Sequence, residues 1–183
     1  MGRERLITMM EIAILAGISV ILGYLKFGAL WAFGGSISLV MVPIFVIAYR
    51  RGWKAGIMTG FLVGVLHLIT GATVVHPVQL VLDYPFAYTV LGFASAFSLQ
   101  KADKAGVSPF WMIAGILLAA TLRFISHFIS GIIWFGEYAP EGMPVALYSF
   151  LYNISYLLPE VLITMVVVVL VARYYPRFFQ VRK

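Results

Sequence analysis

Long apolar runs separated by short polar stretches make up most of the chain. A membrane-spanning helix needs about 20 mostly apolar residues, because each residue adds about 1.5 Å across a hydrocarbon core about 30 Å thick. Runs that reach or approach this length predict helices near 6–25, 36–49, 53–70, 78–98, 109–135 and 144–172. We therefore expect an all-α integral membrane protein in which residues 1–183 form a single domain of six transmembrane helices.

The composition agrees with a protein surrounded by lipid. Of its 183 residues, 62% are hydrophobic and only 11% are charged, whereas soluble domains carry about 45–50% apolar and about 25% charged residues. A core of this size cannot bury so much apolar surface. This excludes a soluble enzyme, a disordered tail and a nucleic-acid-binding domain. Arg3 and Arg5 before an apolar run suggest a signal peptide, but no small-residue cleavage site follows, so we interpret 6–25 as the first transmembrane helix.

The basic residues predict how the helices are oriented. Cytoplasmic loops of membrane proteins carry an excess of Lys and Arg. Eleven of the 13 basic residues flank the predicted helices on one side of the membrane: Arg3, Arg5, Arg50, Arg51, Lys54, Lys101, Lys104, Arg173, Arg177, Arg182 and Lys183. Lys26 lies on the other side, and Arg123 lies inside a segment. This alternation predicts that both termini are cytoplasmic.

Two segments carry small residues at four-residue spacing. In the third segment glycine recurs at every fourth position from Gly52 to Gly64. Such a stripe lies on one helix face and allows backbones to approach closely. We expect this stripe to pack inside the bundle. The first segment has a shorter stripe, Ala13 and Gly17, for which internal packing and docking against a separate membrane subunit both stay open.

Polar and ionisable side chains inside the apolar segments are the candidates for function. Each costs roughly 2.5–3.5 kcal/mol on insertion scales and therefore needs a partner or a role. They are Glu11, His67, Asp83, Arg123, His127, Asn153 and Glu160. Arg123, His127 and Gly131 step by four along one face of the fifth segment. If this face meets Asp83 and its neighbours, the bundle has a pocket that opens outward.

Each of these residues also has a structural interpretation. Asp83 and Arg123 could simply neutralise each other in the membrane. His127 could make a hydrogen bond between helices. Trp134 and Tyr148 lie near helix ends, where aromatic residues often mark the membrane surface without binding any ligand.

Motifs for chemistry are missing from the sequence. It has no cysteine, no GxxxxGK[ST] loop, no HExxH motif and no GxSxG motif, so the usual thiolate, ATPase, metalloprotease and hydrolase sites are excluded. We expect no metal and no cofactor, and a binding protein rather than an enzyme. A membrane enzyme acting on lipids and a purely structural membrane subunit remain alternatives.

Five blocks resemble the thiamine-specific S components of energy-coupling-factor (ECF) transporters: GGSISLVMVPI (34–44), YRRGWKAGIMTGFLVG (49–64), LDYP (82–85), HFISGIIWF (127–135) and LYSFLYNIS (147–155). The resemblance covers nearly the whole chain. It implies a thiamine-capturing subunit of the bacterial plasma membrane that docks on a membrane coupling subunit and two cytoplasmic ATPase subunits. Another vitamin or small cation is the alternative ligand, because a fold alone does not fix the substrate.

The resemblance also implies the residues that meet the ligand. These are Asp83, Tyr84, His127, Gly131, Tyr148 and Asn153, together with an aromatic residue that is either Trp134 or Phe135. The loop after the first helix closes over the ligand in the family, which makes Trp31, Gly34 and Gly35 candidates for a lid. Thiamine suits such a site, since its thiazolium cation favours aromatic faces and its aminopyrimidine needs an acceptor and donors.

Overall fold

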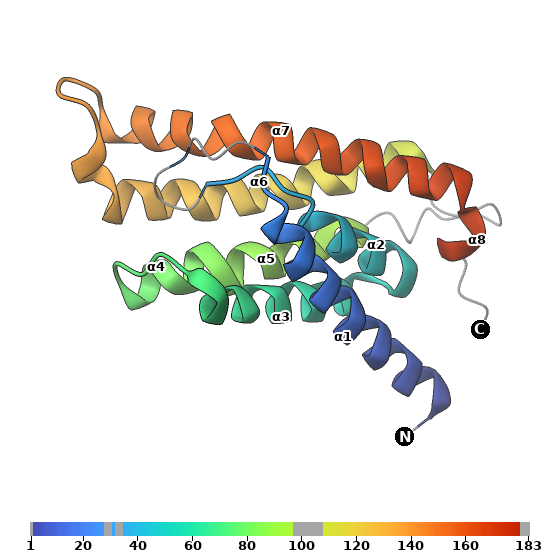
Figure 1. Cartoon of the computed structure of the whole chain (residues 1–183). Coiled ribbons are helices and arrows are strands. Elements are labelled where there is room, and N and C mark those ends of the chain that lie inside the picture. Colours follow the sequence, from blue (N-terminus) through green and yellow to red (C-terminus); the bar gives the residue numbers. More distant parts are fainter. Residues whose placement is uncertain (1, 28–30, 32–34, 97–107, 180–183) are drawn as a thin grey trace.

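The computed structural model describes residues 2–27, 31, 35–96 and 108–179, which are almost entirely helical (Figure 1). Its elements are α1 (Arg3–Tyr24), α2 (Met41–Arg51), α3 (Trp53–Gly71), α4 (Pro77–Val81), the π-helical turn η1 (Leu82–Phe86), α5 (Ala87–Thr89), the 3₁₀ segment η2 (Val90–Ser95), α6 (Pro109–Trp134), the 3₁₀ turn η4 (Gly136–Tyr138), α7 (Val145–Tyr174) and α8 (Pro176–Phe179). Within these ranges, the one β-type pairing is an isolated bridge between Phe27 and Ile37.

Four helices are long and apolar enough to cross a membrane, namely α1, α3, α6 and α7. Helix α2 has 11 residues and is about 16 Å long, which is too short for the hydrocarbon core. The predicted fourth segment is helical from Pro77 to Ser95 but is divided among four short elements. All six predicted segments therefore contain helix, while the described residues hold four clear candidate spans.

Helix α2 lies in the middle of the bundle, which explains why its sequence is apolar on all sides. Its side chains Met41, Ile44 and Phe45 are fully buried in the main hydrophobic cluster, where Leu91 and Ile116 join them from η2 and α6. Pro43 lies in the first turn of α2, where a missing backbone N–H is tolerated.

The predicted start of this helix at residue 36 is wrong, because the residues before Met41 follow an extended path instead. The backbone N–H of Phe27 donates to the carbonyl of Ile37 at 2.8 Å. The hydroxyl of Ser19 on α1 donates to the carbonyl of Val40. These contacts tie the segment to α1 and bring Gly35 and Ser36 to the site described below.

The glycine stripe of α3 packs inside the bundle, as predicted. A side chain at Gly60 would collide with the backbone carbonyl of Tyr88, and one at Gly64 would lie 2.6 Å from the Cα of Pro85. The two small residues of α1 behave differently: Ala13 is exposed, and nothing in the described structure lies within 4 Å of a Cβ built on Gly17. They do not pack inside the described bundle.

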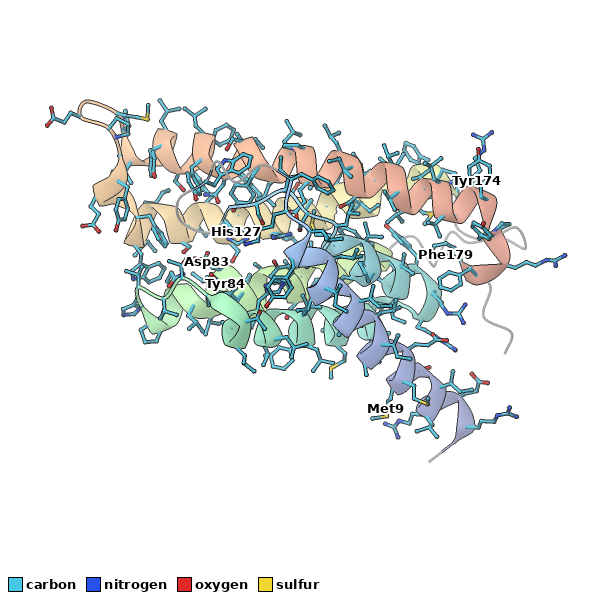
Figure 2. The ribbon with its side chains drawn as sticks, viewed as in Figure 1. Met9, Asp83, Tyr84, His127, Tyr174 and Phe179 are labelled. Atoms are coloured by element: carbon cyan, nitrogen blue, oxygen red, sulfur yellow. The ribbon has the colours of Figure 1, made fainter. Side chains whose placement is uncertain are left out.

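The two ends of the bundle carry different features. The start of α1 and the short helix α8 lie at the same end (Figure 1). Figure 2 shows Met9, Tyr174 and Phe179 toward that end, and Asp83, Tyr84 and His127 far from it. The candidate binding residues are thus separated from both described ends of the chain.

Candidate functional site

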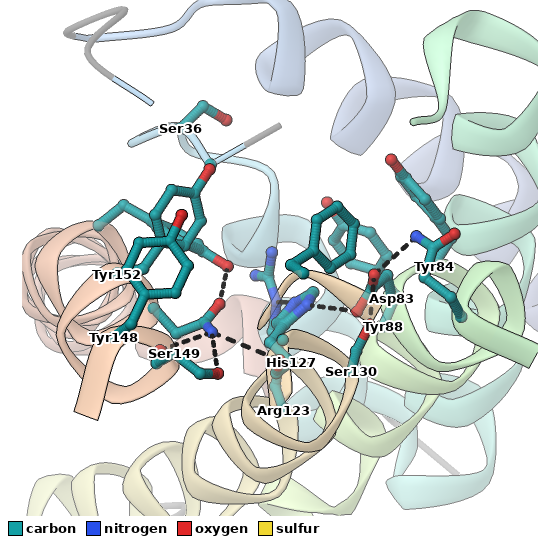
Figure 3. A pocket seen from close by; sticks show the side chains of 16 residues that line it. Ser36, Asp83, Tyr84, Tyr88, Arg123, His127, Ser130, Tyr148, Ser149 and Tyr152 are labelled. Carbon is teal, nitrogen blue, oxygen red and sulfur yellow. Dashed lines mark hydrogen bonds and ion pairs between the residues drawn. The ribbon is translucent and has the colours of Figure 1, made fainter. Parts of the chain in front are cut away.

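A cavity opens between the α4–η1 region, α6, α7 and the extended segment before α2 (Figure 3). The space between its walls, counted out to and including its open mouth, is about 740 Å³. Its lining consists of Gly35, Ser36, Gln79, Asp83, Tyr84, Tyr88, Arg123, His127, Ser130, Gly131, Phe135, Tyr148, Ser149, Tyr152, Asn153 and Tyr156. The structure therefore brings together most of the predicted binding residues from three separate helical regions.

The π-helical turn η1 carries Asp83 and Tyr84 on the cavity wall. Pro85 lies inside this turn and has no backbone N–H, so it cannot continue a regular α-helical hydrogen-bond ladder. The carbonyl of Leu82 accepts a hydrogen bond from the hydroxyl of Ser126 of α6 at 2.7 Å. Short π-helical turns often mark functional sites. This turn fixes the carboxylate and the phenol ring against α6.

Asp83 is surrounded by hydrogen-bond donors. Its Oδ2 accepts from Nε2 of Gln79 at 2.7 Å and from the hydroxyl of Ser130 at 2.8 Å. Its Oδ1 lies 3.1 Å from Nδ1 of His127. Hydrogen bonds to a carboxylate are among the stronger ones in proteins, so Asp83 is held firmly in place.

Arg123 does not pair with Asp83, which corrects the predicted ion pair. Its Nη1 lies 3.2 Å from Oε2 of Glu160 on α7, and the two side chains are only 6% and 1% exposed. The hydroxyl of Ser38 donates to the other oxygen of Glu160 at 2.8 Å. Asp83 meets α6 one to two turns beyond Arg123, at His127 and Ser130, and this leaves Arg123 to Glu160.

Helix α7 supplies an aromatic wall and an amide. Tyr148, Tyr152 and Tyr156 follow one another at four-residue spacing and all line the cavity. Nδ2 of Asn153 donates to the carbonyl of Ser149 at 2.9 Å, and its Oδ1 accepts from the Tyr156 hydroxyl at 2.8 Å. The electron-rich faces of such rings attract cations.

The structure distinguishes between the two neighbouring aromatic residues at the end of α6. Phe135 lines the cavity, whereas Trp134 does not. Trp134 stacks on His76, with ring centroids 5.3 Å apart, so of the two alternatives the cavity lining favours Phe135. One turn earlier, a side chain at Gly131 would collide with the hydroxyl of Ser149, so this glycine lets α6 and α7 meet beside the cavity.

Two of the three lid candidates, Trp31 and Gly35, lie at or beside the same cavity. Nε1 of Trp31 donates to the hydroxyl of Ser155 at 2.7 Å. The rings of Trp31 and Tyr156 form a T-shaped pair with their centroids 6.0 Å apart. Gly35 belongs to the cavity lining. Gly34 lies outside the described residues.

Sequence reasoning missed several residues of this site. Gln79, Ser130, Tyr152 and Tyr156 line the cavity, yet none was predicted. Each lies three or four residues from a predicted site residue and therefore on the same helix face, a spacing that could have identified them. In the described part of the chain, no cluster of three His, Cys, Asp or Glu side chains is arranged to hold a metal ion.

Comparison with known proteins points to one family. The model of the thiamine transporter protein family (Thia_YuaJ) matches residues 9–180. The chain is 36% identical to the thiamine transporter ThiT of Bacillus subtilis, over 97% of this chain and 96% of that one. It is 30% identical to the ThiT of Lacticaseibacillus paracasei, over 96% and 92%.

Solved structures give the same picture. The structure of ThiT from Listeria monocytogenes superposes with a TM-score of 0.87 at 30% identity and covers 97% of this chain and 99% of that one. A structure of the S component of a bacterial ECF transporter superposes with a TM-score of 0.65 at 18% identity, which shows a shared fold alone. The sequence match, the superposition and the arrangement of the cavity lead to one conclusion: the chain belongs to the thiamine transporter protein family.

Proposed function

We propose that this chain is the thiamine-capturing S component of an ECF-type uptake transporter in a bacterial plasma membrane. The observation that carries the proposal is a carboxylate, Asp83, fixed by three donors inside a cavity walled by aromatic rings. The names of the relatives and the family support thiamine as the ligand.

The cavity complements the two rings of thiamine. The aminopyrimidine carries an amino group that can donate to Asp83. The thiazolium cation suits the faces of Tyr84, Tyr148 or Phe135, each contact worth about 0.5–2 kcal/mol. Because Glu160 pairs with Arg123, the negative charge of Asp83 remains available to attract the cationic ligand.

The proposed orientation has six helical segments in the membrane, both termini in the cytoplasm and the cavity open to the outside. The positive-inside rule supports it, because Arg51 pairs with Glu4 in the first turn of α1 and Arg50 lies over the ring of Phe178 in α8. The cavity lies away from the end of the bundle where α1 starts (Figure 2).

The outward face of α1 is the proposed docking site for a membrane coupling subunit. Around Ala13 and Gly17, large apolar side chains point away from the bundle: Met10, Ile14 and Ile21 are 55%, 57% and 65% exposed. Two cytoplasmic ATPase subunits would then supply the energy, since the chain has no nucleotide-binding loop of its own.

Reconstitution into lipid vesicles tests this division of labour. We expect the chain alone to bind radiolabelled thiamine without accumulating it. With the coupling subunit and both ATPases added, thiamine should accumulate only when ATP is present. Accumulation by the chain alone, or chemical conversion of thiamine, would contradict the proposal. Competition by an excess of other vitamins checks the ligand assignment.

A further inference from the structure

Gln79 connects the cavity to the loop that precedes α4. Its side chain is only 1% exposed. Its Nε2 donates to the carbonyl of Thr73 at 3.1 Å and to Oδ2 of Asp83 at 2.7 Å, and its Oε1 accepts from the backbone N–H of Val75 at 3.0 Å. Both ends of the amide are thus fixed, and the amide cannot turn over without losing these bonds.

The hydrogen bonds of Asp83 leave little freedom to its carboxylate. A carboxylate has about four acceptor positions, two on each oxygen. Gln79 and Ser130 occupy both positions of Oδ2, and His127 occupies one position of Oδ1. Among the described residues, one acceptor position of Oδ1 stays available to a ligand.

His127 strengthens this arrangement. Its Nδ1 faces Oδ1 of Asp83 at 3.1 Å, and its Nε2 lies 3.4 Å from Nε of Arg123, which can only donate. The imidazole therefore donates to Asp83 through Nδ1 and accepts through Nε2. Gln79, Ser130 and His127 all donate to Asp83, so the carboxylate can act only as a hydrogen-bond acceptor toward a ligand in the cavity.

We propose that Gln79 is a positioning residue that makes the cavity select a ligand amino group over a carbonyl oxygen. An amino group can donate to the remaining position on Oδ1, whereas a carbonyl oxygen there would face another acceptor. Without the amide of Gln79, Oδ2 loses a donor and the carboxylate is free to turn, so it no longer holds Oδ1 against the ligand. This inference rests on the proposed binding of thiamine at Asp83.

Thiamine and oxythiamine provide the matched pair of probes. Oxythiamine carries a carbonyl oxygen where thiamine carries its pyrimidine amino group, and both have the same thiazolium charge. Dissociation constants for both are measured by calorimetry on the purified chain in detergent. The unaltered chain should bind thiamine at least tenfold more tightly than oxythiamine.

Gln79→Met keeps the length of the side chain and removes its hydrogen-bonding groups. We expect thiamine to bind about tenfold more weakly and oxythiamine to change less than threefold, so that the selectivity falls. Equal weakening of both ligands would mean a merely structural role and would overturn the inference, as would no change in either.

Gln79→Leu serves as a second variant that is uncharged and similar in volume, so it places no second carboxyl group beside Asp83. Like Gln79→Met, it cannot donate to Asp83. The selectivity should fall here too, and an unchanged ratio would overturn the inference. As a control, His76→Ala removes the N-cap of α4 and the stack on Trp134 and should leave the ratio unchanged.

The outcomes separate this inference from the proposed function. If the unaltered chain binds neither ligand, both are overturned. If it binds thiamine selectively and Gln79→Met keeps that selectivity, the inference alone is overturned.

Discussion

Two groups of charged side chains stabilise this bundle in very different surroundings. Beside the cavity, Arg123 and Glu160 form an ion pair whose side chains are almost completely buried. At the other end of the bundle, Glu11 of α1 lies 2.9 Å from Nη2 of Arg50 and 2.7 Å from Nε of Arg51, with about a fifth of the Glu11 side chain exposed. The first group lies between helices that form the site, and the second joins α1 to α2.

The difference separates the binding cavity from the attachment of α1. In the inner pair, Glu160 neutralises the charge of Arg123, which would otherwise repel a cationic ligand. The outer group anchors α1, and Arg50 also lies over the ring of Phe178 in α8 at 4.7 Å. Breaking a buried pair typically costs about 3–5 kcal/mol, and the cost falls as water reaches the charges. Substitutions at the two ends should therefore have separable effects.

The largest effect is expected on transport, from a bulky residue on the outward face of α1. Gly17→Leu should reduce ATP-dependent thiamine uptake to background, because it blocks close approach of a partner helix. Thiamine affinity should stay unchanged, since the cavity is remote. Uptake and binding are measured on the same preparation. Ile14→Leu, on the same exposed side, is the control, because it changes the side chain without adding bulk. Loss of thiamine binding together with uptake in Gly17→Leu would contradict docking.

The largest loss of stability should follow Glu160→Gln. It leaves the buried Arg123 without its charge partner, and the free energy of unfolding should fall by about 3–5 kcal/mol. Thermal melting of the ligand-free chain in detergent measures this. Adding Arg123→Met should restore most of the loss, because removing both charges is far less costly than removing one. A melting temperature unchanged in the single variant would contradict the ion pair.

A smaller effect, on affinity rather than stability, should follow Asp83→Asn. The substitution keeps the shape of the side chain and one acceptor oxygen but removes the negative charge that attracts the thiazolium cation. The affinity for thiamine should fall at least tenfold, or by about 1.4 kcal/mol. Titration calorimetry measures it, and the melting temperature should drop less than in Glu160→Gln. An unchanged affinity would remove Asp83 from the ligand site.

The smallest effect is expected at the outer group. Glu11→Gln removes the charge that Arg50 and Arg51 share, and the stability should fall by less than after Glu160→Gln, because Glu11 and Arg50 keep about a fifth of their side chains exposed. Thiamine affinity should not change. The same melting assay tests this, and a loss as large as that of Glu160→Gln would show that the two groups do not differ as described.

The helical segments could be predicted because an apolar run is a local property of the sequence. The exceptions depend on contacts with distant residues. The start of α2 is delayed because Val40 and Ile37 bond to Ser19 and Phe27. The division of the segment 77–95 follows from Pro85 and from contacts with α6, which hydropathy does not record.

The site could be predicted in its residue types but not in its pairings. Asp83 and Glu160 are both carboxylates in apolar segments, and only the rotation and height of their helices decide which one meets Arg123. The same applies to Trp134, the last residue of α6, and Phe135, which follows it with a non-helical backbone. Such distinctions need the packed structure.

Calorimetric titration of thiamine into the purified chain in detergent tests the central claim most directly. We predict saturable binding of one thiamine per chain in the absence of any other protein and of ATP. No heat of binding, at concentrations of chain and ligand where the protein is folded, would contradict a thiamine-capturing site in this cavity.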